Sequence, residues 1–317
     1  MARAVRADLA GVTVGDGLPV VVMGVVNVSP ESFHPGSVYQ GEEAIVRAAL
    51  GMVEAGAALI DVGARSTAPY LDTAIDDATE SDRLARAVEL LATKLPVPVS
   101  ADTSRPGPAR TALDAGARVI NDVSTLRDPL LARLIASRSA GLILMASPAP
   151  GGAVAGRRPR GVRRTAVRGD RGSRNARLRR KETGRPVVVI GDLLSSGMRQ
   201  ARAARIAEAR IVIDPGVGFF RAAGMAWHAW DVRVLAELRT LRALGRPICV
   251  GVSRKSFIGA IVERTDTAER LAGSLGATAI AVLNGAALVR THDVAETLDA
   301  VRVAERVRAA RDAGGAR

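Results

Sequence analysis

The sequence predicts an α/β fold, a (β/α)8 TIM barrel with eight parallel strands in one closed sheet. Short apolar segments alternate with helical segments eight times, and strict alternation implies a parallel sheet with right-handed crossovers. An open sheet of that width would more often carry an edge strand or a second domain, so a closed barrel is favoured. No Gly-x-Gly-x-x-Gly follows the first strand, which weakens the alternative of an open dinucleotide-binding fold. We therefore expect residues 1–317 to form a single barrel domain.

The first strand is predicted from residues 21–26, VVMGVV, which are mostly β-branched or apolar and suit a strand buried on both faces. The strand is expected to end at Asn27, because Pro30 cannot continue a hydrogen-bonded ladder and disfavours helix at Ser29. An amide at the carboxyl end of a strand, before a loop rich in Gly, Pro and Ser, lies where α/β folds gather ligand groups.

Seven further segments are short and apolar like the first strand, and several end in a polar residue. These predicted strands are 57–63, 97–102, 118–122, 141–145, 210–214, 247–252 and 287–291. Helices are predicted from apolar residues at helical spacing and from bounding Gly and Pro residues. They are 41–56, 76–95, 106–116, 128–137, 193–209, 229–244, 267–284 and 294–311. After a break in the pattern, ordered structure is expected to resume at 186–190.

The positive charge of the chain belongs to one segment. Residues 151–185 hold thirteen Lys and Arg against two acids, so they contribute +11 of the net +13. The segment has few large apolar residues and cannot form the amphipathic helix that a barrel needs there, so we expect a disordered insertion. A second interpretation is a reading-frame artefact of a GC-rich gene. The segment has no aromatic residue for base stacking, and nucleic acid is not an expected partner.

Cysteine usage and hydropathy predict a cytoplasmic protein. The single cysteine, Cys249, leaves no intrachain disulfide and no thiolate metal cluster, which fits a reducing compartment. We find no pattern of a signal peptide and no apolar stretch of about 18 residues, so no membrane span is expected.

Polar residues gather at the predicted carboxyl ends of the strands, which meet at one mouth of a barrel. They are Asn27, Asp61, Asp102, Asn121, Asp214, Lys255, Arg290 and His292. One Asp at a strand end usually caps a helix, but repeated capping would not require Lys, Arg and His beside carboxylates. Carboxylates and amides suit a flat nitrogen heterocycle, whereas Asn27, Arg290 and His292 suit phosphate oxygens. These residues predict a substrate with a heterocyclic head and a pyrophosphate tail, with Mg²⁺ arriving with the phosphates.

Seven motifs together resemble the dihydropteroate synthase family of pterin-binding (β/α)8 barrels. In order they are MGVVNVSPESF, LIDVGARST, VSADT, VINDVS, IVIDPGVGFF, VGVSRKSFIG and LVRTHDV. The agreement covers residues 21–148 and 209–308. The resemblance implies transfer of a 7,8-dihydropterin-6-ylmethyl group from its pyrophosphate ester to an arylamine, p-aminobenzoate, in folate biosynthesis. It also implies a homodimer formed through the last helices.

The resemblance assigns roles to individual positions. The implied catalytic residues are Asp214, Lys255 and Arg290. The implied pterin-binding residues are Asp102, Asn121, Asp214, Lys255, Arg290 and Met145. The implied pyrophosphate-binding residues are Asn27, Thr67, Arg290 and His292, and Asn27 also lies on the metal side. The residues expected on the arylamine side are Arg65, Thr67, Phe219, Arg221 and Ser256.

The chain departs from the common family pattern in its loops. Pro35 replaces a carboxylate in the first loop, and the usual Glu-Ser-Thr-Arg-Pro of the second loop reads Arg-Ser-Thr-Ala-Pro from Arg65. With Trp227-x-x-Trp230-Asp231, these departures resemble the branch found where tetrahydromethanopterin is made. The acceptor there is a ribosylated aminobenzene phosphate, whose phosphate Arg65 and Arg221 could bind. Drift in the loops, or a pterin-binding barrel without turnover, are the other interpretations.

Overall fold

A closed barrel of eight parallel strands forms the centre of the molecule and confirms the predicted fold class. The computed structural model describes residues 4–29, 41–65, 75–148, 185–220 and 225–314. The strands are β3 (Val21–Asn27), β4 (Leu59–Gly63), β5 (Val99–Asp102), β6 (Val119–Asp122), β7 (Gly141–Met145), β8 (Ile211–Asp214), β9 (Ile248–Gly251) and β10 (Ala286–Thr291). They follow the chain around the barrel, and β10 closes it against β3. Each strand lies within two residues of its predicted bounds.

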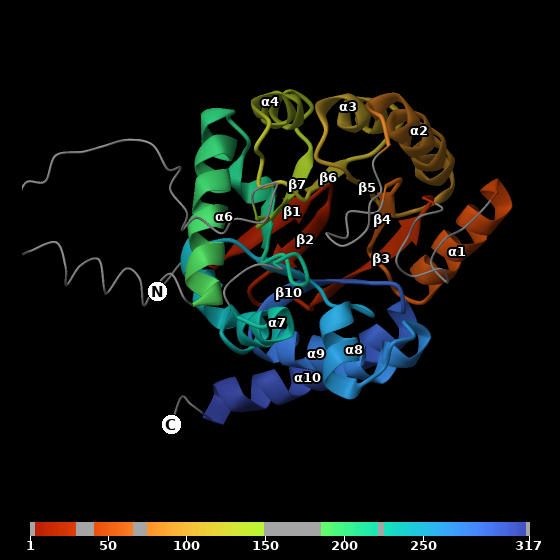
Figure 1. Ribbon diagram of the computed structural model, residues 1–317. Coiled ribbons are helices and arrows are strands. Elements are labelled where there is room, and N and C mark those ends of the chain that lie inside the picture. Colours follow the sequence, from red (N-terminus) through yellow and green to blue (C-terminus); the bar gives the residue numbers. More distant parts are fainter. Residues whose placement is uncertain (1–3, 30–40, 66–74, 149–184, 221–224, 315–317) are drawn as a thin grey trace, which may run out of the picture.

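Helices surround the barrel (Figure 1). They are α1 (Glu42–Glu54), α2 (Asp77–Lys94), α3 (Pro106–Asp114), α4 (Pro129–Ser137), α6 (Pro186–Ala203), α7 (Trp227–Ala236), α8 (Ser256–Val262), α9 (Leu271–Leu283) and α10 (Val294–Gly314). Short 3-10 helices are η2 (Glu208–Arg210), η3 (Leu238–Leu244) and η4 (Ala268–Arg270). Side chains of Asp76 and Asp128 cap α2 and α4 by accepting from backbone N–H groups of the first turn.

Several helix predictions were wrong in detail. The helix predicted at 193–209 is α6 (Pro186–Ala203), so residues 186–190 form its first turns rather than a separate element. Their sequence, Pro-Val-Val-Val-Ile, has the β-branched content of a strand, but proline at the first helical position starts a helix well. The predicted helix 229–244 is divided into α7 and η3 at Glu237, and α8 was not predicted.

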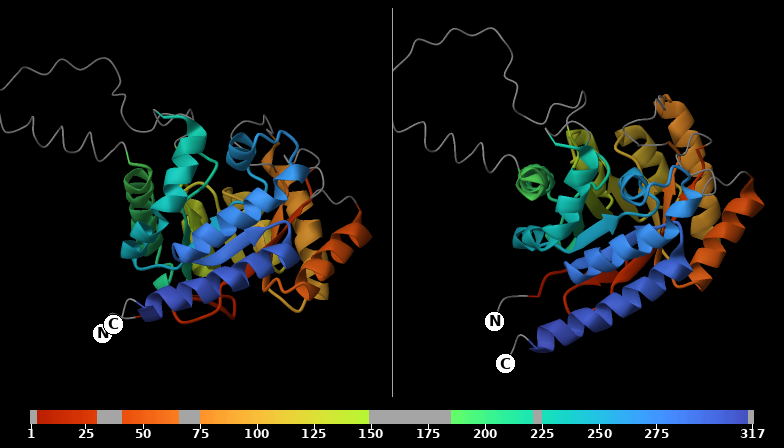
Figure 2. Two further views of the ribbon diagram at one scale, coloured as in Figure 1. Left: turned by 90° about the horizontal axis from the view of Figure 1, so that it is seen from below. Right: turned by 60° about the horizontal axis from the view of Figure 1, so that its bottom comes forward.

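An antiparallel hairpin, β1 (Arg6–Leu9) and β2 (Val12–Gly15), closes the amino-terminal end of the barrel. Figure 2 shows it at one end of the strands, beside α10. Its turn residues, Ala10 and Gly11, both have positive φ, as a tight two-residue hairpin turn requires. The buried side chains of Leu9 and Val14 pack against the apolar interior of the barrel, namely Met23, Leu59, Val119, Ile143, Val212, Cys249 and Leu288.

A second, larger core lies between the outer face of the barrel and the helices. It takes the other side chains of each strand, because successive residues of a strand face opposite sides. Within the described part of the chain, no helix is both long and apolar enough to span a membrane. The insertion predicted at 151–185 lies almost wholly outside the described residues; only Arg185, which precedes α6, is included.

Candidate active site

The alternation of strand residues places polar groups at the mouth of the barrel. In four strands, an apolar side chain in the barrel interior is followed two residues later by a polar side chain. The two side chains point to the same side of the sheet. These pairs are Leu59 and Asp61, Val119 and Asn121, Val212 and Asp214, and Leu288 and Arg290. A polar layer therefore lies directly above the apolar layer that fills the barrel.

Arg290 is the centre of one half of this layer. Its Nε donates to Asp61 Oδ2 at 2.6 Å, and its Nη2 donates to Asp102 Oδ2 at 2.7 Å. Asn121 Nδ2 also donates to Asp61 Oδ2, at 3.0 Å. Burial opposes the charge of Arg290, but the two carboxylates raise the pKa of the guanidinium above its usual range. The side chain therefore stays charged and is fixed by β4 and β5.

One carboxylate oxygen of Asp102 has no hydrogen-bond partner within the described residues. Burial raises the pKa of its carboxyl to about 7, with Arg290 lowering it and Asp61 raising it further. Its Oδ1 is buried and has no hydrogen-bond partner within the described residues, and the same holds for Asp61 Oδ1. Buried polar atoms are rarely left unpaired unless a ligand or water meets them. Both atoms are therefore candidate acceptors for N–H groups of a bound heterocycle.

Asp214 and Lys255 form the other half of the layer. Asp214 Oδ1 accepts from Gly216 N at 2.7 Å. Burial raises the pKa of Asp214, while Lys255 lowers it. Lys255 Nζ donates to the carbonyl oxygen of Val217 and lies 5.0 Å from the centre of the Phe219 ring, within cation–π range. Burial lowers the pKa of Lys255 to about 8, with Asp214 acting in the opposite direction.

Two glycines let the loop after β8 pass close to these groups. Gly216 and Gly218 have φ of 69° and 85°, a region that favours glycine. A Cβ at Gly216 would collide with the carbonyl oxygen of Ala146, and one at Gly218 would lie 3.0 Å from Lys255 Cδ. Gly216 thus needs glycine for backbone conformation and for space, and Gly218 needs it for backbone conformation.

His292 directly follows β10 and lies next to the loop after β9. Ser253 Oγ is 2.9 Å from His292 Nδ1, and His292 N donates to the same oxygen at 3.3 Å. A hydrogen bond at Nδ1 fixes the orientation of the imidazole. His292 and Lys255 are therefore both placed by the short loop that follows β9.

Asn27 is the residue that was predicted to lie on the metal side of the site. No group of three or more His, Cys, Asp or Glu within the described ranges could hold a metal ion. Asn27, at the end of β3, has its Oδ1 3.1 Å from where a Cβ at Gly63 would be. It can supply one amide oxygen, and Mg²⁺ usually takes few protein ligands and completes its shell with phosphates and water.

The structure brings together Asp102, Asn121, Asp214, Lys255 and Arg290 at the carboxyl ends of the barrel strands. Met145 is buried and pairs in register with Asp214, which suits the predicted apolar wall. Ser256 is the first residue of α8. The predicted residues Thr67 and Arg221, and the first-loop Pro35, lie outside the described residues.

Arg65 is partly buried and pairs with a buried acid. Its Nε donates to Glu80 Oε2 at 3.2 Å, and Glu80 is 1% exposed. The same carboxylate accepts from Thr103 Oγ1 at 2.6 Å and from Arg105 Nη1 at 3.0 Å. The guanidinium of Arg65 therefore already has a charge partner in the protein.

Two important residues were not assigned ligand or supporting roles from the sequence. Asp61 was placed at the mouth only by its position in the strand, yet it joins Arg290 to Asn121. Ser253 was not singled out, although it contacts His292. Asp61 could have been found by counting two residues on from the interior Leu59, but the Ser253 contact crosses between strands and leaves no signal in spacing.

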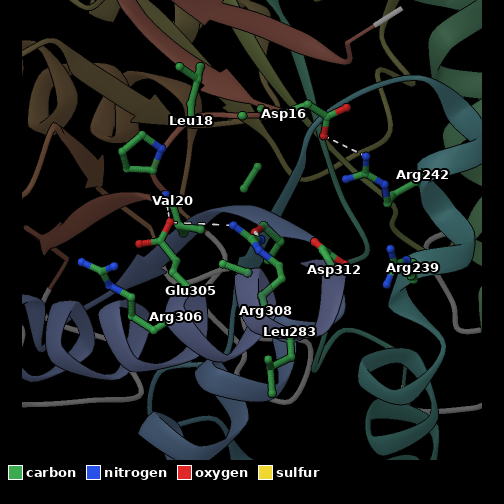
Figure 3. Close-up of a pocket in the computed structure, with 17 residues that line it drawn as sticks. Asp16, Leu18, Val20, Arg239, Arg242, Leu283, Glu305, Arg306, Arg308 and Asp312 are labelled. Carbon is green, nitrogen blue, oxygen red and sulfur yellow. Dashed lines mark hydrogen bonds and ion pairs between the residues drawn. The ribbon is translucent and has the colours of Figure 1, made fainter. Parts of the chain in front are cut away.

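A cavity of about 490 Å³ lies at the opposite, amino-terminal end of the barrel. Figure 3 shows charged side chains from residues 15–20, η3 and α10 around it. Asp16 pairs with Arg242 at 2.8 Å, and Glu305 accepts from Val20 N at 2.7 Å. None of the predicted site residues lines this cavity, and these contacts join the hairpin to the outer helices.

Comparisons with known proteins agree with this geometry. The family model "Pterin binding enzyme" matches residues 23–292. The dihydropteroate synthase of Mycobacterium leprae is 38% identical over 299 residues, which cover 90% of this chain and 92% of that protein. A Yersinia pestis dihydropteroate synthase in a sulfonamide drug complex superposes with a TM-score of 0.78 at 28% identity, covering 96% and 99% of the two chains. A Xanthomonas albilineans dihydropteroate synthase with 4-aminobenzoic acid gives 0.77 at 34% identity, covering 97% and 99%.

Proposed function

The chain belongs to the family of pterin-binding enzymes, and from this premise we propose that it catalyses the dihydropteroate synthase reaction. It transfers the 7,8-dihydropterin-6-ylmethyl group from its pyrophosphate ester to p-aminobenzoate and releases pyrophosphate, in folate biosynthesis. The observation that carries the proposal is the polar layer at the barrel mouth, where Asp102, Asn121, Asp214, Lys255 and Arg290 lie close together above an apolar floor.

The reaction breaks one bond and forms another at the exocyclic methylene carbon. The C–O bond to pyrophosphate breaks, and its electron pair leaves with the phosphate oxygen. The amine lone pair then forms the C–N bond, and the amine proton passes to solvent. The electron-rich pterin ring stabilises positive charge on the methylene, so the protein has to orient the two substrates and stabilise the separated charges.

The carboxylates bind the pterin ring and favour its positive charge. The unpaired Oδ1 atoms of Asp61 and Asp102 can accept from ring N–H groups. Asp214, buried beside Lys255, places negative charge near the same ring when ionised. These carboxylates stabilise the cation more than the neutral ester, which lowers the barrier to loss of pyrophosphate.

Arg290, His292 and Asn27 are proposed to bind the leaving group. Arg290 supplies a fixed positive charge, and His292 and Asn27 lie at the ends of the neighbouring strands β10 and β3. When bound with the pyrophosphate, Mg²⁺ would neutralise part of its charge, and Asn27 is the residue proposed to meet that ion. Thr67 is proposed for the same side from the family pattern.

The acceptor side needs no general base, because an arylamine is neutral and nucleophilic near neutral pH. Phe219 and Ser256 are proposed to contact the acceptor, since both lie beside Lys255 in the chain or in space. Arg65 and Arg221 remain proposals for this side. Arg65 shares the Glu80 carboxylate with Arg105 and keeps part of its positive charge, so the choice of p-aminobenzoate as acceptor is supported by the similarity to known dihydropteroate synthases and not by this ion pair.

A competition experiment identifies the acceptor. The protein is supplied with the pterin pyrophosphate, Mg²⁺ and equal amounts of p-aminobenzoate and the ribosylaminobenzene phosphate, and the products are identified by mass spectrometry. We expect 7,8-dihydropteroate as the main product. A product carrying the ribosyl phosphate would contradict the proposed acceptor, and no product would contradict the proposed function.

A cytoplasmic location and a homodimer belong to the same proposal. Cys249 is a buried free thiol, which suits a reducing compartment. The outer helices α9 and α10 expose apolar side chains, with Ile280 48% and Val303 66% exposed; a second copy of the chain could cover them. Light scattering should give twice the mass of the chain.

A further inference from the structure

Arg254, between two residues of the site, has an unusual backbone conformation. Its φ is 54°, in the left-handed region that residues other than glycine rarely adopt. Neighbouring groups hold this conformation from both sides. Arg254 N donates to Ser274 Oγ at 2.8 Å, and its carbonyl oxygen accepts from Arg270 Nη1 at 3.1 Å. Strained backbone of this kind persists where the surroundings fix it, and it is common at functional sites.

The side chain of Arg254 forms its hydrogen bonds with other residues of the protein. Nη2 donates to Asp293 Oδ1 at 2.6 Å and Nε to Asp293 Oδ2 at 2.9 Å, a two-point ion pair. Nη1 donates to the carbonyl oxygens of Thr267 and Ala268 at 2.9 and 2.8 Å. The side chains of Arg254 and Asp293 are only 11% and 15% exposed. The guanidinium therefore ties the loop after β9 to the start of α10 and to the segment before α9.

The two residues next to Arg254, Ser253 and Lys255, contact the strands' loops on opposite sides of β9. The strand β9 lies between β8 and β10. Ser253 contacts His292, just after β10, whereas Lys255 contacts Val217, in the loop after β8. Residues two apart in an extended strand would point to the same side. The left-handed turn at Arg254 separates them.

We propose that Arg254 is a positioning residue, which holds the turn that places His292 through Ser253 and Lys255 directly. This inference rests on the proposed function, because it assigns His292 to the pyrophosphate and Lys255 to the pterin. Arg254 itself does not touch the substrates. Its loss should impair both halves of the site together, whereas loss of His292 should impair the pyrophosphate half alone.

A matched pair of substitutions separates the backbone effect from the side-chain effect. Arg254→Ala and Arg254→Gly both remove the ion pair, but only glycine accepts a φ of 54° without strain. We expect Arg254→Ala to lower kcat/KM about 100-fold and Arg254→Gly to retain about fivefold more activity than the alanine variant. Asp293→Asn removes the ion pair but keeps the hydrogen bonds from Arg254 to the carbonyl oxygens of Thr267 and Ala268, so its kcat/KM should lie between those of Arg254→Ala and the wild type. Melting temperatures and circular dichroism accompany each variant.

Two further readouts distinguish positioning from a general loss of stability. Calorimetry should show weaker binding of both pyrophosphate and 6-hydroxymethyl-7,8-dihydropterin to Arg254→Ala, whereas His292→Ala should weaken pyrophosphate binding only. The chain has three histidines, so the ring ¹⁵N signals of His292 can be assigned by difference. Loss of the Ser253 contact should shift its Nδ1 signal in Arg254→Ala.

The results are decisive in each direction. Wild-type kcat/KM in Arg254→Ala, or a lower melting temperature with an unchanged His292 signal and unchanged affinities, would overturn the inference. If the wild-type chain shows no transfer activity, the proposed function fails. The His292 signal then decides whether Arg254 places this loop.

Discussion

Arg290 pairs with Asp102 at 2.7 Å although β3 and β4 lie between their strands in the barrel. The guanidinium extends across the mouth and also contacts Asp61, on the intervening strand β4, at 2.6 Å. Both carboxylates are buried, and Arg290 is the cation that both of them contact. These contacts within the protein fix the half of the polar layer around Arg290.

Arg290→Met should destabilise the protein strongly, by about 3–5 kcal/mol, because it leaves two buried carboxylates without their cation. Without Arg290 the pKa of Asp102 rises further above its usual 3.8. The native state then binds a proton that the unfolded state has lost, so the stability of the variant falls as pH rises. Urea unfolding at about pH 5.5 and about pH 8 should show the larger loss at the higher pH.

Arg302→Met is the matched control for Arg290→Met. Arg302 forms an exposed ion pair with Asp299 on α10, and such pairs contribute roughly 0–1 kcal/mol. Similar unfolding free energies for the two variants would contradict the role given to Arg290.

Asp214→Asn should lower turnover about 100-fold or more while leaving the fold intact, because the amide keeps the shape but cannot supply negative charge to the cation. Steady-state kinetics and circular dichroism measure the two effects. Asp82→Asn, at an exposed position on α2, is the control and should match wild type. An unchanged rate in a folded Asp214→Asn protein would remove this residue from the mechanism.

The pH dependence of activity should report Lys255. Burial lowers the pKa of its ammonium from 10.5 to about 8, with Asp214 partly offsetting this. The side chain therefore loses its charge as pH rises through about 8, and kcat/KM should fall there. Lys255→Arg stays charged, so its kcat/KM, although lower, should remain flat across that range. Parallel declines in both proteins would show that another group titrates.

Removal of Mg²⁺ with a chelator should abolish turnover but leave the binding of 6-hydroxymethyl-7,8-dihydropterin unchanged. The reason is that no group of three or more His, Cys, Asp or Glu among the described residues could hold a metal ion, so the ion is expected to come with pyrophosphate. Calorimetry with and without chelator measures this. Weaker pterin binding or a lower melting temperature after chelation would indicate a resident metal instead.

The strands and the residue types at the mouth could be predicted from the sequence because both follow from local patterns. A buried parallel strand is a short apolar run, and a polar residue at its end is visible in the sequence. Residues 186–190 were harder to assign because β-branched residues occur in helices when tertiary packing requires them. The β1–β2 hairpin was missed because each of its strands has only four residues.

Contacts between side chains of different elements could not be predicted in the same way. The sequence places Asp61, Asp102 and Arg290 at strand ends, but their contacts depend on the register and curvature of the closed sheet. The partner of Arg65, Glu80, lies on a helix outside the barrel. The pattern of the loop suggested a ligand role for Arg65, and only the packed structure reveals its ion pair.

The most direct test is the rate of pyrophosphate release from 7,8-dihydropterin-6-ylmethyl pyrophosphate in the presence of Mg²⁺, with and without p-aminobenzoate. We predict release that depends on p-aminobenzoate in the wild-type protein and is nearly lost in Asp214→Asn. No acceptor-dependent release by the folded wild-type protein, or equal release by the variant, would contradict the assignment of this reaction to the barrel mouth.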